Sequence, residues 1–230
     1  MLFSSTLSRR IGFAVLAVAV LGSVAACGSK SLTDNFTSKI TASDFQASGT
    51  ITGSYSTTVS GTTVHSTITG TDRIKGKDSA MSMTIAADAT TPQAFSTSTD
   101  TIDVDGNTYL RDNNGPWTKS ADKADATTIT GAVNTLGLTD KGTQSHFGQQ
   151  LHRLDPTKSV PPSLLFSGTT GITNPIVTLT FWAKDDGTPA GMTMTATYTQ
   201  ASSGSTDDVT MLLEISFDSL SGVSIDAPSM

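Results

Sequence analysis

Cysteine is almost absent from this 230-residue sequence, since Cys27 is the only one. A single cysteine excludes an intrachain disulfide and a zinc site built from several thiolates. Exported domains often rely on disulfides, so a domain without them must depend on apolar burial. The chain is long enough for one domain with a sizeable core.

Long apolar runs and basic residues are also scarce. The uncharged stretch Ile11–Val20 is shorter than the roughly 20 residues that a transmembrane helix needs, and no later run reaches that length. The chain has 20 acidic and 14 basic residues, for a formal charge of −6. Such an acidic chain is a poor candidate for binding nucleic acid.

Residues that could hold a metal are few and poorly placed. The only histidines are His65, His146 and His152. We place His146 and His152 on one extended run, about 20 Å apart, which is too far for a shared metal. The segment Asp103–Gly106 resembles part of a calcium loop but lacks the later glutamate. We therefore expect no metal.

Catalytic patterns are missing as well. The carboxylate pairs Asp185-Asp186 and Asp207-Asp208 have Gly or Ser neighbours and are predicted to be solvated turn residues. There is no nucleophile elbow, phosphate loop or zinc-binding helix motif. Trp117 and Trp182 are expected to pack near strand ends, and they form no stacking array. We therefore expect that the protein is not an enzyme and that it binds no cofactor.

The first 27 residues carry a clear export pattern. Arg9 and Arg10 precede the apolar stretch Ile11–Val20, and small residues follow up to Ala26 and Cys27. This order is typical of a secretory signal. The end of the segment, Val-Ala-Ala-Cys, resembles the bacterial lipobox, which implies cleavage between Ala26 and Cys27 and a diacylglyceryl group on the Cys27 thiol. The alternative is an ordinary signal peptide with a chance cysteine.

Lipidation of Cys27 would hold the protein on the extracytoplasmic face of a cell membrane, because two or three acyl chains anchor firmly. Removal of residues 1–26 would take away two basic residues and no acidic one, leaving 204 residues with a formal charge of −8. Anionic head groups should repel such a domain, so it would stand off the membrane. We interpret residues 27–43 as a flexible tether, although the spacing of Leu32, Phe36 and Ile40 also allows one or two helical turns.

From Asp44 onward most of the sequence alternates between apolar and polar residues, a pattern typical of half-buried strands. Residues 45–55 show it first, and Asp105-Gly106 and Asp185–Gly187 mark hairpin turns. Later extended segments are 63–75, 81–85, 102–111, 143–154, 177–181, 192–198 and 209–217, and Val223 and Ile225 close the domain. Residues 124–138 have helical spacing instead, and 156–174 are predicted to be a loop or short helix carrying an apolar plug. The pattern predicts a mainly β domain over 44–230, with one antiparallel sheet curled around apolar contents.

Several motifs occur in an order that resembles a known family. They are Asp103–Tyr109, Trp117, Gly142–Gly148, Leu151-His152, Phe181–Pro189, Met192 and Ala227-Pro228. Together with the lipobox, they resemble the LppX/LprAFG group of lipoproteins within the LolA/LolB-like superfold. The resemblance implies an incomplete antiparallel β-barrel of about nine to eleven strands, with one to three covering helices and an apolar cavity between them.

Characterised members of that group carry lipids or lipid-modified molecules through the cell envelope, so the resemblance implies a lipid or glycolipid cargo. The candidate cavity-lining residues are Phe45, Ile51, Met81, Met83, Ile102, Leu179, Phe181, Met192, Met194, Met211 and Leu213. Methionine suits a surface that adapts to varied chains, yet the same pattern is compatible with an ordinary core. The family's usual roofing helix after the anchor is replaced here by the short, polar residues 28–43.

Three functions follow from this reading. The leading hypothesis is a monomeric, membrane-anchored lipoprotein that binds or carries a hydrophobic cargo. The second is an accessory surface lipoprotein with a packed core that presents a face to a partner. An envelope hydrolase is a third class, for which no catalytic residues are visible.

Overall fold

A computed structural model describes residues 31–59, 61–88, 95–120, 129–166, 171–202 and 205–229. The predicted signal peptide, Ala26 and Cys27 lie outside this part of the chain. The strands are β1 (Gln46–Val59), β2 (Thr62–Lys75), β3 (Asp78–Ala87), β4 (Ser96–Val104), β5 (Asn107–Asp112), β6 (Thr118–Lys119), β7 (Leu138–His146), β8 (Gln149–Pro156), β9 (Ile172–Ala183), β10 (Pro189–Ser202) and β11 (Ser205–Ser219). The helices are α1 (Leu32–Ile40), α2 (Ile129–Leu136) and α3 (Ser163–Phe166).

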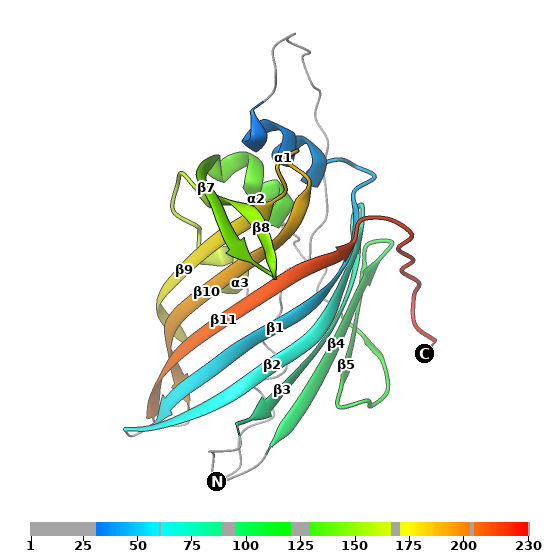
Figure 1. Cartoon of the computed structure of the whole chain (residues 1–230). Coiled ribbons are helices and arrows are strands. Elements are labelled where there is room, and N and C mark those ends of the chain that lie inside the picture. Colours follow the sequence, from blue (N-terminus) through cyan, green and yellow to red (C-terminus); the bar gives the residue numbers. More distant parts are fainter. Residues whose placement is uncertain are drawn as a thin grey trace.

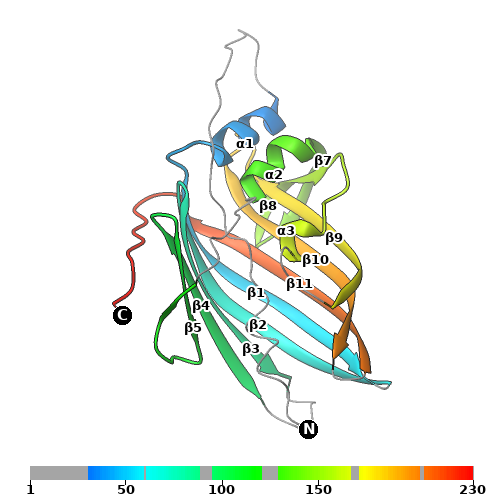
Figure 2. The same cartoon turned by 180° about the vertical axis from the view of Figure 1, so that it is seen from behind.

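All eleven strands belong to one antiparallel sheet with the order β6-β5-β4-β3-β2-β1-β11-β10-β9-β8-β7. The sheet consists of two meanders, and the pairing of β1 with β11 joins them at the centre. The sheet is open and strongly curved, with the helices gathered over the half that contains β7–β10 (Figures 1 and 2). This architecture confirms the predicted fold class, including the number of strands.

Glycines in the central strands allow the sheet to curve this strongly. A Cβ atom at Gly53 of β1 would lie 2.1 Å from the carbonyl oxygen of Leu212, and one at Gly70 of β2 would lie equally close to that of Ser82. Ordinary side chains cannot be accommodated at such distances. Neighbouring backbones therefore approach each other at these two positions because no side chain intervenes.

We expect Gly53→Ala to lower the free energy of unfolding by about 2 kcal/mol or more, because the added methyl group forces β1 away from β11. Urea denaturation monitored by circular dichroism would measure the loss. Thr52→Ala, at the adjacent exposed position, is the matched control and should change stability by no more than about 0.5 kcal/mol. Equal stability of the two variants would show that the close approach does not constrain residue 53.

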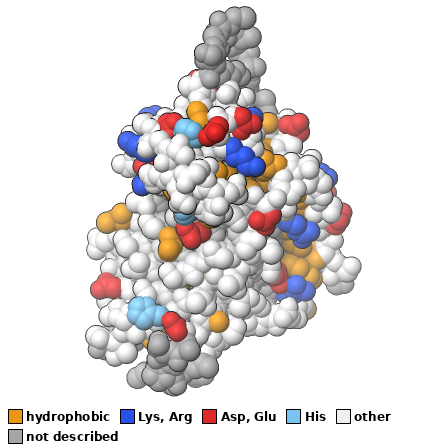
Figure 3. Space-filling view, viewed as in Figure 1, with side chains coloured by type: hydrophobic (Ala, Val, Ile, Leu, Met, Phe, Trp, Pro, Cys, Tyr) orange, Lys and Arg blue, Asp and Glu red, His pale blue; other side chains and the backbone are white. Residues whose placement is uncertain are grey.

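Burial alternates along the strands as the sequence pattern predicts. In β2, for example, Ser66, Ile68, Asp72 and Ile74 are buried. The intervening residues Thr67 and Arg73 face the other way and are exposed. The buried residues face the concave side, where they form the main hydrophobic core with residues of all three helices. Figure 3 views the strands from the same side as Figure 1, and most of that surface is uncharged polar side chain or backbone.

Helix α1 corrects the prediction of a flexible tether for the segment from Ser31 onward. Ser31 caps the helix: its hydroxyl accepts a hydrogen bond from the Asp34 N–H at 3.1 Å, and the Asp34 carboxylate accepts one from the Ser31 N–H. Phe36 and Ile40 lie on one face and are almost completely buried. The tether interpretation is therefore wrong here, and the alternative of one or two helical turns is what the structure shows.

The extended run predicted over residues 143–154 is also wrong, because the chain reverses at Phe147 and Gly148. Both residues have positive φ, 48° and 71°, and they connect β7 to β8. Thr143 lies opposite His152 in this hairpin, so His146 points to the other face of the sheet. The predicted spacing of 20 Å along one strand therefore does not apply. The two histidines instead lie on opposite faces of the sheet.

The helical predictions are confirmed where residues are described. Within the predicted segment 124–138, α2 places Val133 and Leu136 in the core, and residues 121–128 lie outside the described part. The predicted plug is α3, whose Leu164 and Leu165 are buried. After β11 the chain is irregular, and the buried Val223 donates a backbone hydrogen bond to the Gln46 side chain. None of the described helices has the length and apolar character needed to span a membrane.

Candidate binding site on the concave face

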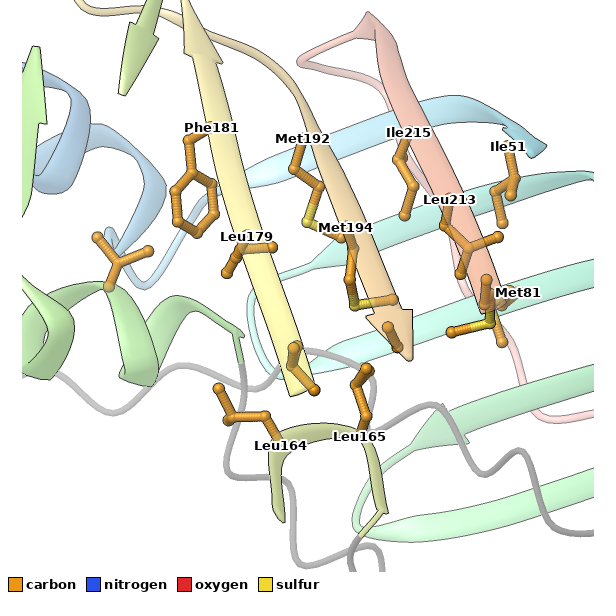
Figure 4. Close-up of a cluster of buried hydrophobic side chains, with 14 of the residues drawn as sticks. Ile51, Met81, Leu164, Leu165, Leu179, Phe181, Met192, Met194, Leu213 and Ile215 are labelled. Carbon is orange, nitrogen blue, oxygen red and sulfur yellow. The ribbon is translucent and has the colours of Figure 1, made fainter. Parts of the chain in front are cut away.

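The central strands present a continuous apolar surface on the concave face. The pairing register sets residues in rows across the sheet, because directly opposed residues point to the same side. One row contains Phe181, Met192, Ile215 and Ile51. The next row contains Leu179, Met194 and Leu213, followed by Gly53 and Ile68. The side chains of these rows that Figure 4 labels lie side by side on one face of β9, β10, β11 and β1.

Most of the predicted lining residues meet in this surface. Ten of them belong to the one buried core cluster: Phe45, Ile51, Met81, Met83, Leu179, Phe181, Met192, Met194, Met211 and Leu213. Ile102 does not, and its prediction is wrong. It pairs with Ala80 and Tyr109, so it lies on the opposite face from Met81. That the ten residues line a binding cavity stays a prediction.

Methionine is concentrated on the concave face. The sequence has seven methionines, of which Met1 and Met230 are the first and last residues. The other five are Met81, Met83, Met192, Met194 and Met211, and all five are buried on this face. Because the methionine side chain is unbranched and polarizable, it fills irregular spaces and adapts to different partners. The surface thus has an adaptable composition across β3, β10 and β11.

The three helices cover part of this surface. Leu164 and Leu165 of α3 point towards the β9 and β10 side chains (Figure 4). The Phe166 ring packs edge-on against Tyr198, with centroids 4.8 Å apart. At the other end, the ring of Phe36 from α1 lies 5.5 Å from that of Phe181. The helices therefore cover the part of the concave face formed by β9 and β10.

An ion pair and several hydrogen bonds connect α1 to the turn between β9 and β10. The Lys39 ammonium group lies 3.1 Å from the Asp186 carboxylate and also donates to the Thr188 hydroxyl at 2.8 Å. Hydrogen bonds from the Thr188 side chain and backbone, with that from Lys39, hold the pKa of Asp186 at about 2. A Cβ atom at Gly187 would lie 2.6 Å from the Asn35 Cβ, so glycine permits the close contact of turn and helix. Asp186 is an exposed turn residue, as predicted, with a structural partner that the sequence did not reveal.

The concave face becomes polar towards β4 and β5. On β4, Thr99 lies directly opposite Met83, and Thr101 lies directly opposite Met81. Ser79, on the same face, is followed by Asp103, which accepts hydrogen bonds from the Thr108 and Ser79 hydroxyls. Burial raises the pKa of the Asp103 carboxyl in spite of these hydrogen bonds. The apolar surface is thus bordered on one side by hydroxyls and carboxylates.

Asp72 is a buried carboxyl inside this border. It lies on β2 between Gly49 of β1 and Met81 of β3, and only 7% of the residue is exposed. Burial raises its pKa to about 7, and the opposing contribution is a hydrogen bond from the Arg73 backbone. Our sequence analysis missed Asp72, although its even spacing from Ile68 and Ile74 places it on their buried face.

A second polar group lies further along the same face. Burial raises the pKa of Tyr55 and raises that of Tyr198 to about 12, and the two hydroxyls are hydrogen-bonded to each other. Ser66, directly opposite Tyr55, is 3% exposed, and its hydroxyl has no hydrogen-bond partner. The concave face therefore combines a wide apolar centre with a few buried polar groups.

Two of the histidines and both tryptophans have side-chain partners on the outer face or at strand ends. His146 stacks on Trp182 with ring centroids 3.9 Å apart and lies 3.2 Å from the Glu214 carboxylate. His152 lies between Asp140 and Asp185, at 3.0 Å and 3.3 Å. The Arg111 guanidinium covers the ring of Trp117. Among the described residues, no group of three or more His, Cys, Asp or Glu side chains is placed to hold a metal.

Comparison with known proteins gives distant structural similarity only. No protein-family model matches the sequence, and no curated protein matches it either. A crystal structure described as an outer membrane lipoprotein-sorting protein domain, from Vibrio parahaemolyticus, aligns over 75% of this chain and 86% of its own, with 10% identity and a TM-score of 0.28. A DUF1329 family protein from Desulfovibrio piger aligns over 84% of this chain and 93% of its own, again with 10% identity and a TM-score of 0.28. Similarity at this level does not assign a function.

Proposed function

We propose that this protein is a lipoprotein of the cell envelope that binds the apolar chains of a lipid, or of another hydrophobic molecule, on the concave face of its sheet. The carrying observation is the continuous apolar surface of β9, β10, β11, β1 and β3, with five methionines on it. Lipid chains vary in length and curvature, and a methionine-rich surface can adjust to them.

Burial alone can hold such a cargo. Each CH₂ group removed from water contributes about 0.8 kcal/mol, so one long acyl chain supplies ample binding energy without covalent chemistry. The lipobox at Val24–Cys27 supports an anchor on Cys27, which would keep the domain at a membrane, its source of lipid. The similarity of the sequence motifs to the LppX/LprAFG group favours the same role.

The second candidate is an accessory surface lipoprotein with a packed core. The observation in its favour is that Phe36, Leu164 and Leu165 already pack against the concave face. In that case the methionines would serve packing, and the protein would act through its outer surface.

Native mass spectrometry of the protein purified from a lipid-rich host, followed by organic extraction, separates the two. We expect extra mass that extracts as lipid. A clean apo mass, still clean after incubation with mixed envelope lipids, would contradict the cargo proposal and favour the accessory role.

We expect Met194→Gln to reduce the extracted lipid about ten-fold, because a buried amide without partners costs about 1–3 kcal/mol and 1.4 kcal/mol corresponds to a factor of ten. Met194 is 4% exposed at the centre of the apolar surface. Met194→Leu keeps the volume and apolar character and should retain wild-type lipid uptake. Circular dichroism should confirm that both variants are folded, and equal uptake by the two would argue against binding at this surface.

A further inference from the structure

The hydroxyl of Ser66 is buried on the concave face without a hydrogen-bond partner. Ser66 lies on β2 and is only 3% exposed, and its Oγ atom makes no hydrogen bond to any described residue. Buried hydroxyls are usually hydrogen-bonded, because an unsatisfied one costs the desolvation energy of the group. The position therefore suits a partner that a bound molecule supplies.

The side chains next to Ser66 on the same face do not satisfy its hydroxyl. Tyr55 lies directly opposite on β1, but its own hydroxyl is hydrogen-bonded to Tyr198 and Thr57. On the other side, β3 places Ala87 beside Ser66, and a methyl group offers neither a donor nor an acceptor. The Ser66 hydroxyl thus lies between a tyrosine that is bonded elsewhere and an apolar side chain.

The concave face next to Ser66 is partly accessible to solvent. The helices lie over the half of the sheet that contains β9 and β10, away from β3 and β4 (Figure 2). Ile85 and Ala87 of β3 and Thr97 of β4 belong to this face and are only half-buried. Ile85 lies directly opposite Ile68 and packs against the main core. An apolar chain lying over Ile85 and Ile68 would therefore end beside Ser66.

This part of the concave face offers hydroxyl groups and no positive charge. The only basic residues in β1–β3 and β9–β11 are Arg73 and Lys75. They flank the buried Ile74, so both lie on the convex face. A carboxylate or phosphate group bound here would be buried without a counter-charge, which is costly. A neutral hydrogen-bond acceptor fits the surface better.

We propose, on the basis of the function proposed above, that the Ser66 hydroxyl donates a hydrogen bond to the ester carbonyl of a neutral acyl lipid. The carbonyl is the first polar group at the end of an acyl chain, so a chain lying over Ile85 and Ile68 brings it to the next row of the sheet, where Ser66 lies. A carbonyl oxygen accepts from a hydroxyl and carries no net charge. The site thus distinguishes acyl esters from lipids that carry the same chains on ether bonds.

Two probe lipids that differ only in the carbonyl groups test the proposal. The protein, stripped of bound lipid, is incubated with vesicles containing dioleoylglycerol or its diether analogue, dioleylglycerol, then re-isolated and extracted for quantification. We expect uptake of the ester to exceed that of the ether about five-fold, because one net hydrogen bond changes affinity by about two- to ten-fold. Ser66→Ala should lower ester uptake to the level of the ether and leave ether uptake unchanged.

Thr67→Ala removes a hydroxyl at the adjacent, exposed position of β2 and is the matched control, with the wild-type preference expected. Equal uptake of the two lipids by wild type, or a preference retained in Ser66→Ala, would overturn the assignment while leaving lipid binding intact. Uptake of neither lipid, and of no envelope lipid, would instead overturn the proposed function.

Urea denaturation of the lipid-free protein provides a second, independent test. Ser66→Ala should be at least as stable as wild type, because the substitution removes a buried hydroxyl that has no partner. It also leaves a folded variant for the uptake measurement. A clear loss of stability in Ser66→Ala, with Thr67→Ala unchanged, would show that the hydroxyl is already hydrogen-bonded without lipid and would overturn the assignment.

Discussion

The Phe36→Ala variant is expected to lose about 4 kcal/mol of unfolding free energy. Phe36 is completely buried, and its ring packs against that of Phe181, which is also completely buried. Truncation of a buried phenylalanine removes its apolar burial and leaves a cavity, at a cost of about 3–5 kcal/mol. The loss should be near the upper part of this range if the surrounding strands cannot relax into the space.

The position of Phe36 on a nine-residue helix makes this effect informative. A helix as short as α1 is marginal on its own, so its stability comes from packing. The Lys39–Asp186 ion pair is exposed and worth little by comparison. Loss of the Phe36 ring should therefore loosen α1 from the turn of β9 and β10 and uncover Phe181.

Urea denaturation of wild type and variant, with tryptophan fluorescence and circular dichroism as probes, would measure the change. Ser38→Ala, on the exposed side of the same helix, should leave stability within about 0.5 kcal/mol of wild type. A loss of less than about 1 kcal/mol in Phe36→Ala would mean that α1 contributes little to the stability of the core.

The strands of this protein were predictable because most of them have one solvent-exposed face and one buried face. Alternation of this kind marks both the strand and the face that each residue occupies. It correctly placed Ile51, Met192 and Leu213 on one surface although they lie far apart in sequence. The turn at Asp105-Gly106 was equally visible, and both residues have positive φ in the structure.

The errors occurred where this signal was weak or interrupted. In β7, residues 139–145 are all exposed, so no alternation marked the reversal at Phe147. Helix α1 has only two buried residues, which is too few to distinguish a docked helix from a polar tether. The alternation around Ile102 correctly predicts a strand, but we assigned Ile102 to the wrong face because it is apolar. On β4 the polar residues Thr101 and Asp103 lie on the concave face, and Ile102 lies on the convex face.

Asp72→Asn is expected to make the lipid-free protein's stability less dependent on pH between about 4 and 7. Burial raises the pKa of Asp72 from 3.8 to about 7, so the folded state binds a proton more tightly than the unfolded chain. Stability therefore falls as pH rises through this interval, because the carboxyl must lose its proton while it is buried. Each pKa unit corresponds to about 1.4 kcal/mol, so the total decrease is about 4 kcal/mol.

The other carboxyls with shifted pKa values are present in both wild type and variant, so their contributions cancel in the comparison. Asp103 acts in the same direction, since burial raises its pKa, but it is present in both proteins. Asp186 acts in the opposite direction and titrates near pH 2, below the interval, and its exposed position screens its contribution. The difference between wild type and Asp72→Asn thus isolates the buried carboxyl.

Urea denaturation of both proteins at pH 5 and pH 8 would measure this difference. Wild type should lose stability between the two values, and Asp72→Asn should lose less. Asp218→Asn, which removes an exposed carboxylate at the end of β11, is the control and should behave as wild type. The buried amide itself costs about 1–3 kcal/mol where it lacks partners, so the change with pH is more informative than stability at one pH. Identical changes in wild type and Asp72→Asn would mean that the Asp72 carboxyl is solvated or already paired. A reduced change in Asp72→Asn would show that burial on the concave face favours the protonated form of the Asp72 carboxyl.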